Sequence, residues 1–246
     1  MKENKYDDNI FFQKYSQMSR SQKGLAGAGE WETLKKMLPD FKGKRVLDLG
    51  CGYGWHCIYA MEHGASSVVG VDISHKMLEV AKEKTHFPQV EYKCCAIEDV
   101  EFPEESFDVI LSSLAFHYVA DYEILVKKIY RILKSGGKLV FTVEHPVFTA
   151  YGTQDWYYNE KGEILHFPVD NYYYEGKRTA VFLGEKVTKY HRTLTTYLNT
   201  LLSNGFIINH IVEPQPPENM MDIPGMQDEM RRPMMLIVSA NKKVDR

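Results

Sequence analysis

The sequence holds 246 residues with a formal net charge of −3, and 26% of the residues are charged. This length allows one domain around one core, and the slightly negative balance offers no basic field for nucleic acid, which we exclude as a partner. The sequence shows no basic-then-apolar signal at its start and no apolar run of about eighteen residues, so we expect a cytoplasmic protein without a membrane partner.

The predicted elements begin with a packing helix over 28–38, where Trp31 and Leu34 share one face and Pro39 ends the helix. Short β-rich runs then alternate with helical patterns as far as residue 144. The predicted strands are 45–50, 67–72, 90–94, 107–113 and 138–144, and the predicted helices are 55–64, 74–85 and 121–137. Ser74 and Asp121 are suitable N-caps, and the glycines at 136–137 suit a helix end. This alternation predicts a doubly wound α/β fold, a parallel sheet with helices on both faces.

The pattern breaks after the fifth strand. From 147 to about 190 the chain is rich in Tyr, Trp, Gly and Asp, which predicts an insertion of loops and a hairpin. A helix begins near His191 and ends at Gly205, and it is followed by strands at 206–214 and 234–240. We therefore expect a single domain over 1–246, with an N-terminal helical cap over 1–40 and an insertion over 147–190.

The four cysteines are Cys51, Cys57, Cys94 and Cys95. They form no zinc spacing and no disulfide framework of a secreted protein. We expect buried free thiols and no metal.

Three glycines mark the first strand-to-helix turn. In "RVLDLGCGYGWH" Gly50, Gly52 and Gly54 let the backbone approach a ligand at a helix N-terminus. Asp72 ends the second strand, where a carboxylate can accept hydrogen bonds from a ribose diol. Trp55 takes the place of the third glycine of the dinucleotide fingerprint, and no Gly-Lys-Ser/Thr is present. The pattern predicts a nucleotide-like ligand without specifying which one.

The same residues carry a resemblance to the class I S-adenosylmethionine-dependent methyltransferases. "VLDLGCGYG" resembles their first signature and "VVGVDIS" their second, while 98–119 and 133–143 are similar to the segments around their fourth and fifth strands. More loosely, 11–31 and 189–220 resemble the flanks of a bacterial small-molecule branch, of the methyltransferase type 11 kind. The resemblance implies a Rossmann-like, seven-stranded, mostly parallel sheet with an antiparallel last strand.

The resemblance also implies the cofactor, S-adenosyl-L-methionine, and its product S-adenosyl-L-homocysteine. It places Gly50, Cys51 and Gly52 at the methionine and ribose end, Asp72 on the ribose diol, and Ile73 and Met77 against the adenine. It further implies contacts with the cofactor from Ile97, Glu98, Ser113, His117, Tyr15 and Arg20. Ala96 stands where many relatives carry an acid for the adenine amino group, so adenine recognition falls to the backbone, Glu98 or Asp99.

Methyl transfer requires collinear sulfur, methyl carbon and acceptor atom, and an acceptor that must lose a proton needs a base, usually histidine. The candidate bases are His117, His145 and His191, and for each a structural role stays open. Six aromatic residues of the insertion are candidates for an acceptor lid or for cover of an apolar surface: Trp156, Tyr157, Tyr158, Tyr172, Tyr173 and Tyr174.

We therefore predict an enzyme that transfers a methyl group from S-adenosylmethionine to a small-molecule acceptor by in-line displacement. The chain lacks the Asn/Asp-Pro-Pro-aromatic motif, a Pro-Cys nucleophile and the cysteine spacing of radical enzymes, which excludes those subclasses. Two alternatives stay open: a NAD-dependent oxidoreductase and a non-catalytic cofactor-binding protein of the same fold. The sequence fits both a monomer and a homodimer.

Overall fold

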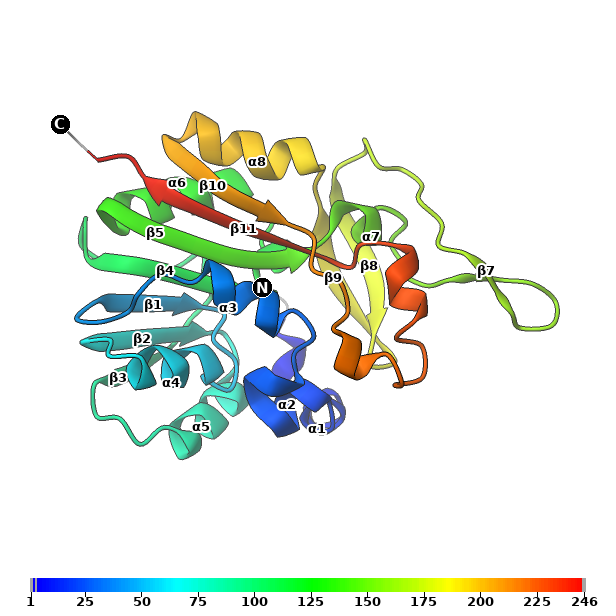
Figure 1. The fold of residues 1–246 in the computed structure, drawn as a ribbon, viewed down its shortest axis with the longest axis horizontal. Coiled ribbons are helices and arrows are strands. Elements are labelled where there is room, and N and C mark those ends of the chain that lie inside the picture. Colours follow the sequence, from blue (N-terminus) through cyan, green and yellow to red (C-terminus); the bar gives the residue numbers. More distant parts are fainter. Residues whose placement is uncertain (1, 3, 245–246) are drawn as a thin grey trace.

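A computed structural model describes residues 2 and 4–244, so residues 1 and 3 of the predicted cap and residues 245–246 lie outside the described residues. Its largest element is a seven-stranded sheet with the order β10-β11-β5-β4-β1-β2-β3 (Figure 1). The strands are β1 (Arg45–Leu49), β2 (Ser67–Asp72), β3 (Val90–Cys94), β4 (Phe107–Ser113), β5 (Leu133–Glu144), β10 (Phe206–Val212) and β11 (Met235–Lys242).

Strands β1 to β5 pair in parallel, whereas β11 pairs antiparallel with β5 and with β10. The predicted seven-stranded, mostly parallel sheet with an antiparallel last strand is therefore confirmed. All the carboxyl ends of the parallel strands meet at one edge, which is where open α/β sheets bind ligands.

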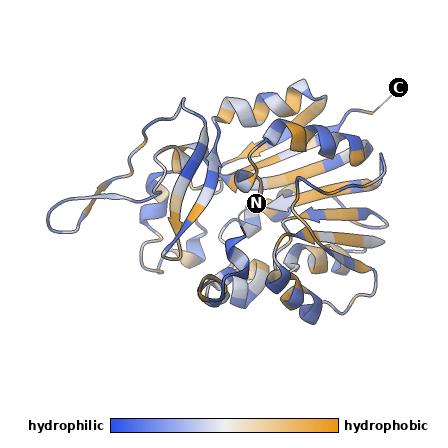
Figure 2. Ribbon diagram, turned by 180° about the vertical axis from the view of Figure 1, so that it is seen from behind, coloured by the Kyte–Doolittle hydropathy of each residue, from blue (hydrophilic) through white to orange (hydrophobic). Residues whose placement is uncertain are grey.

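Helices cover both faces of the sheet. On one face, α6 (Tyr122–Ile132) and α8 (Leu194–Ser203) bury the larger apolar core, which includes Leu125, Ile129 and Leu201. On the other face lie α3 (Trp31–Met37), α4 (Trp55–Glu62) and α5 (His75–Lys84). Figure 2 shows the apolar colouring concentrated along the strands that these helices enclose. Apolar burial on both faces is the driving force for the doubly wound arrangement.

The predicted N-caps are confirmed, since the Ser74 side chain accepts from the Met77 N–H and that of Asp121 from the Ile124 N–H. The predicted end of the third helix is wrong. Helix α6 stops at Ile132, and β5 begins at Leu133, opposite Phe107 on β4. Gly136, at φ +72°, lies in an irregularity of β5 rather than in a helix C-cap. The buried Leu133 side chain makes strand pairing start before the glycines.

The insertion contains a short helix and two hairpins, where one hairpin was predicted: α7 (Pro146–Ala150), the β6–β7 pair (Tyr157–Tyr158 and Ile164–His166) and the β8–β9 pair (Gly176–Phe182 and Glu185–His191). Figure 1 shows the β8–β9 hairpin beside the arrowheads of the parallel strands, while the segment with β7 projects away from the body. His191 was expected at the start of a helix, but it is the last residue of β9. The helix begins at Leu194, because Thr193 caps it.

The N-terminal segment consists of η1 (Lys5–Asp7), α1 (Asn9–Ser16), α2 (Ser19–Lys23) and η2 (Gly24–Gly27). Phe11 of α1 is fully buried against Ala180 and Val187 of the β8–β9 hairpin. The segment therefore contacts the insertion, from which it is separated by most of the chain. The remaining short helices are η3 (Phe116–Tyr118), η4 (Glu218–Met220) and η5 (Asp228–Arg231). Among the described residues, no helix is long and apolar enough to cross a bilayer.

All four cysteines are free thiols, as expected. The expectation that all are buried is wrong: Cys51 and Cys57 are buried, whereas Cys94 is exposed and Cys95 is half-buried. Cys94 ends β3, which is the edge strand of the sheet, so its side chain is covered on one side only.

Candidate functional site

A cavity of about 580 Å³ opens at the carboxyl edge of the parallel strands. This volume lies within the range of ligand sites, roughly 300–1,000 Å³. The N-terminal segment, the loops after β1 to β4, the end of β5 and the β8–β9 hairpin all contribute to its walls. The cavity brings together eleven of the predicted site residues: Tyr15, Arg20, Gly50, Gly52, Asp72, Ile73, Met77, Ile97, Glu98, Ser113 and His117.

The floor of this cavity is the glycine turn after β1. Gly50 and Gly52 line the cavity with φ angles of +78° and +52°, which are accessible mainly to glycine. A Cβ on Gly50 would lie only 2.4 Å from the Cβ of Ala115. The Cys51 side chain points instead into the core, where it is buried. The turn thus presents bare backbone to a ligand, as a nucleotide-like group at a helix N-terminus requires.

Asp72 connects the turn to the second loop. Its Oδ2 accepts from the Gly52 N–H and its Oδ1 from the Ser74 N–H, both at 2.9 Å. Burial raises the pKa of this carboxyl group, although these backbone hydrogen bonds oppose the rise. A carboxylate has about four lone-pair sites, so two remain for a ligand. The two hydroxyl donors of the ribose diol of the implied cofactor fit these two acceptor sites.

Beneath the turn lies Asp48, which is 1% exposed. The Cys57 thiol lies 3.5 Å from its Oδ2, while Oδ1 is buried without a hydrogen-bond partner in the described structure. Burial raises the pKa of Asp48 to about 7. Burying this carboxyl group beneath the glycine turn with one oxygen unpaired therefore costs folding free energy.

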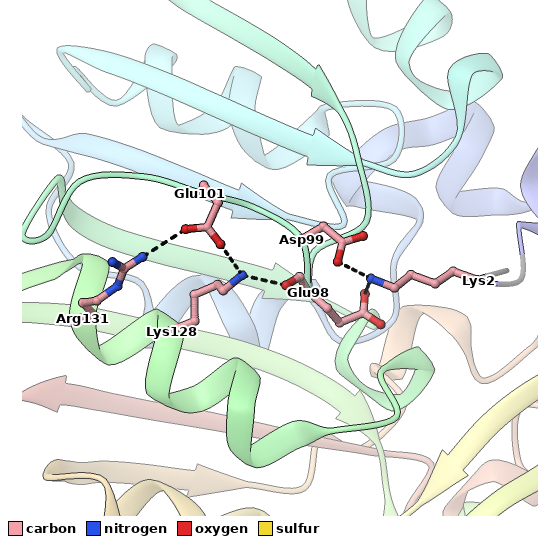
Figure 3. A network of polar contacts seen from close by, with 6 residues as sticks. All are labelled: Lys2, Glu98, Asp99, Glu101, Lys128 and Arg131. Carbon is pink, nitrogen blue, oxygen red and sulfur yellow. Dashed lines mark hydrogen bonds and ion pairs between the residues drawn. The ribbon is translucent and has the colours of Figure 1, made fainter.

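The loop after β3 is held in place by a polar network (Figure 3). Lys128 of α6 donates to the Glu98 carbonyl at 2.7 Å and to the Glu101 carboxylate at 3.0 Å, and Arg131 also contacts Glu101. On the other side of the loop, Lys2 pairs with Asp99 at 2.6 Å. The network fixes the backbone that brings Ile97 and Glu98 to the cavity.

The N-terminal segment closes the cavity on the side of the second loop. Asp7 accepts from the Ser74 hydroxyl at 2.6 Å and from the Lys76 N–H at 3.1 Å, so it adds a second cap to α5. Arg20 lines the cavity and donates to both carboxylate oxygens of Glu30, each at 2.9 Å. Tyr15 and Arg20 thus reach the cavity from a segment that is anchored to the glycine-turn half of the fold.

The three candidate histidines lie in different surroundings. His117 lines the cavity, and burial lowers its pKa to about 4. His145 does not reach the cavity, because its Nδ1 caps α7 at the Val147 N–H and its Nε2 lies 2.8 Å from a Glu213 carboxylate oxygen. His191 is engaged at both ring nitrogens.

The geometry of His191 defines its tautomer. The Tyr172 carbonyl lies 2.8 Å from Nε2 and can only accept, so Nε2 carries the proton. Nδ1 then accepts from the Thr149 hydroxyl at 2.7 Å. With both nitrogens paired to protein groups, His191 joins β9 to α7 and to the loop before β8, and it leaves no lone pair for a ligand.

None of the six aromatic residues named from the insertion lines the cavity. Tyr173 and Tyr174 are among the most exposed side chains, and Tyr157 and Tyr158 are also exposed. Trp156 packs under Arg232, whose guanidinium lies 5.0 Å from its ring centre. The insertion reaches the cavity instead through the β8–β9 hairpin, which contributes Lys177, Phe182, Val187, Thr188 and Tyr190.

Several cavity residues were missed by the sequence analysis. Glu144, the last residue of β5, ends a predicted strand at the ligand-binding edge, so its position was a usable signal. Tyr6 and the hairpin residues had no comparable signal, because their approach depends on tertiary packing. Within residues 2 and 4–244, no group of three or more His, Cys, Asp or Glu side chains is arranged to hold a metal ion.

Comparison with known proteins gives consistent matches. The family model for a methyltransferase domain matches residues 47–141. A Listeria monocytogenes protein assigned as an S-adenosylmethionine-dependent methyltransferase is 59% identical, with a TM-score of 0.86 over 89% of this chain and 99% of that chain. An S-adenosylmethionine-dependent methyltransferase from Mesorhizobium loti is 41% identical, with a TM-score of 0.82 over 89% and 100%. An uncharacterized protein of Haemophilus influenzae is 34% identical over 96% of both chains.

Proposed function

Because the chain belongs to the S-adenosylmethionine-dependent methyltransferases, we propose that it transfers the methyl group of this cofactor to a small-molecule acceptor. Membership of the family decides against the nicotinamide-dependent alternative. When bound, S-adenosylmethionine would supply a methyl group on a sulfonium: the acceptor atom would bond to the methyl carbon as the carbon–sulfur bond breaks, releasing S-adenosylhomocysteine and the proton of the acceptor. Family membership is established by the comparisons; the small-molecule acceptor and the in-line geometry of transfer are what we propose.

The observation that carries this proposal is one continuous cavity with two kinds of wall. On one side are the glycine turn, Asp72 and the loop after β3, which suit the cofactor. On the other side are η3, the end of β5 and the β8–β9 hairpin, which lie outside the glycine turn and the loops after β2 and β3. A volume of about 580 Å³ leaves room for an organic molecule of modest size but not for a folded polymer.

The proposed roles follow from position. Gly50, Gly52 and Asp72 bind the methionine and ribose end of the cofactor through backbone and carboxylate. The adenine is surrounded by Ile73, Met77, Ile97 and Glu98. The N-terminal segment closes the cavity with Tyr15 and Arg20. Ser113 lies near the methionine group. His117 contacts the acceptor. The N-terminal cap and the β8–β9 part of the insertion together act as the lid that excludes water.

We place the reaction in the cytoplasm, since the four free thiols suit a reducing compartment. The test uses S-adenosylmethionine labelled on its transferable methyl, incubated with the protein and an extract of its own host, followed by separation on a size filter. Label in the low-mass fraction is expected. Label retained with protein or nucleic acid would contradict the small-molecule acceptor, and a boiled enzyme sample provides the background.

A further inference from the structure

The half of the cavity beyond the cofactor loops, which we call the acceptor chamber, is mainly aromatic and apolar. Its walls include Tyr118 from η3, Phe182 and Tyr190 from the β8–β9 hairpin, and Met234 next to β11. Lys5 and Lys177 lie at its rim; Lys177 is exposed, and Lys5 faces Glu185 at 3.8 Å. The polar side chains that line this chamber include His117 of η3 and Glu144, the last residue of β5.

The Glu144 carboxylate is held from behind by two residues of the insertion. Lys189 of β9 donates to Oε1 at 2.5 Å, and Gln154 donates to Oε2 at 2.6 Å. Lys189 also donates to the Gln154 side-chain carbonyl at 2.8 Å, which closes a ring of three side chains. The Lys189 side chain is 3% exposed, compared with 13% for Glu144. Of the three, only Glu144 lines the cavity.

This ring is costly as a purely structural feature. Replacing a buried ion pair with apolar residues of similar volume is often neutral or stabilising, so its presence calls for another reason. Gln154 is also held at φ +62°, in the left-handed region that non-glycine residues adopt at a cost. The ring therefore lowers the stability of the fold, and its effect is to fix the orientation of the Glu144 carboxylate.

Glu144 faces the chamber as a charged hydrogen-bond acceptor. Burial raises its pKa, but the interactions with His117, Lys189 and Gln154 outweigh burial, and the pKa lies below its ordinary value. Two of its roughly four lone-pair sites are used by Lys189 and Gln154. The others are available to a group in the chamber.

His117 faces the same chamber as a neutral donor. The Glu144 backbone N–H donates to its Nδ1 at 3.4 Å, so the ring proton lies on Nε2. Burial lowers the pKa of His117 to about 4, which keeps the ring neutral near pH 7. A fixed acceptor and a fixed donor therefore lie side by side in an aromatic chamber.

We propose that the acceptor is a neutral aromatic molecule whose hydroxyl group donates to the Glu144 carboxylate and accepts from the His117 Nε2–H. This inference rests on the proposed function. A hydroxyl group satisfies both partners at once. An ammonium group has no lone pair for His117, and a carboxylate is repelled by Glu144. Tyr118, Phe182 and Tyr190 line the chamber, so an aromatic acceptor would pack against aromatic side chains.

The test compares four small probes on the protein saturated with S-adenosylhomocysteine, by ligand-observed NMR titration at pH 7.5. The probes are phenol, anisole, benzoate and benzylamine, which differ in the polar group on one ring. Phenol is expected to bind about tenfold more tightly than anisole, since it adds one hydrogen bond to a charged acceptor. Benzoate and benzylamine are expected to bind more weakly than phenol. Equal binding of phenol and anisole, or tighter binding of either ion, overturns the proposal.

A double variant locates the phenol site. Glu144→Leu with Lys189→Met removes both charges together, avoids an unpaired buried ion and leaves no acceptor oxygen at position 144, so it is expected to abolish the preference for phenol over anisole. The matched control is Glu123→Leu with Lys127→Met, which replaces an exposed ion pair of 2.7 Å on α6. A preference that survives in the Glu144/Lys189 variant contradicts the proposal. The wild-type probe series decides the question even if this variant does not fold.

These results are separable from the methyl-transfer test. Label in the low-mass fraction together with tight binding of benzoate or benzylamine would overturn the hydroxyl proposal alone. A clear phenol preference without label in any fraction would contradict the proposed function and support the chamber chemistry.

Discussion

Replacing Asp72 with alanine is expected to weaken binding of S-adenosylhomocysteine about a hundredfold. The Asp72 carboxylate lines the cavity and already accepts two backbone N–H groups, which leaves two acceptor sites for a ribose diol. A hydrogen bond to a charged group is worth about 1.5 kcal/mol at the low end, so two give about 3 kcal/mol. At about 1.4 kcal/mol per tenfold change in affinity, this is roughly a factor of one hundred.

Calorimetric titration with a cofactor analogue isolates the ribose contact. Wild type and Asp72→Ala are each titrated with S-adenosylhomocysteine and with its 2′,3′-dideoxy analogue, which completes a double-mutant cycle. If Asp72 holds the diol, wild type loses most of its affinity when the hydroxyls are removed, and the variant loses almost none. Circular dichroism on both proteins confirms that the fold is intact. Additive losses, or an affinity of the variant within threefold of wild type, would refute the assignment.

Three further predictions concern the same cavity. Gly50→Ala is expected to cost about 1–3 kcal/mol of unfolding free energy more than Gly162→Ala, since both glycines have φ +78° but only the former meets a neighbouring atom; urea unfolding measures the difference. Asp48→Asn is expected to stabilise the protein above pH 7. The folded-state pKa of Asp48, about 7, exceeds its ordinary 3.8, so stability falls as pH rises between these values, because the carboxyl group ionises in the unfolded chain while it stays protonated in the folded protein. Up to about 4 kcal/mol is gained at pH 8 and little at pH 4, and a difference that does not change with pH would contradict this. His117→Ala is expected to reduce label transfer at least tenfold with unchanged affinity for S-adenosylhomocysteine, while His145→Ala retains transfer; the reverse pattern would reassign the acceptor contact.

The backbone of the candidate cofactor site was predictable because it depends on local requirements. Gly50 and Gly52 are needed wherever a strand turns into a helix at positive φ, and their φ angles of +78° and +52° agree with that reading. Apolar runs of strand length predicted the parallel strands, and parallel strands bring their carboxyl ends to one edge. Asp72, at the end of the second strand, therefore reaches Gly52 without further information.

The surroundings of each histidine could not be predicted in this way. His117, His145 and His191 look alike in the sequence, since each lies near a strand end. Only tertiary packing brings Glu213 to Nε2 of His145 and pairs both nitrogens of His191, one of them with a residue 42 positions away. What a titratable side chain can do depends on its partners, and these come from distant segments.

By itself, the sequence determined the order of the parallel strands and their helices along the chain, the glycine turn, and the caps at Ser74 and Asp121. Each of these follows from contacts within a few residues or from a repeated pattern of apolar residues. The family was indicated separately, by the resemblance of the motifs at 46–54 and 68–74 to those of known methyltransferases. The tertiary structure alone decided the long-range contacts around the cavity: it joins Glu144 to Lys189, 45 residues away, and Asp7 to Ser74, 67 residues away. Such pairs form only after the sheet has assembled and brought the two segments together, because neither partner has a local preference that selects the other.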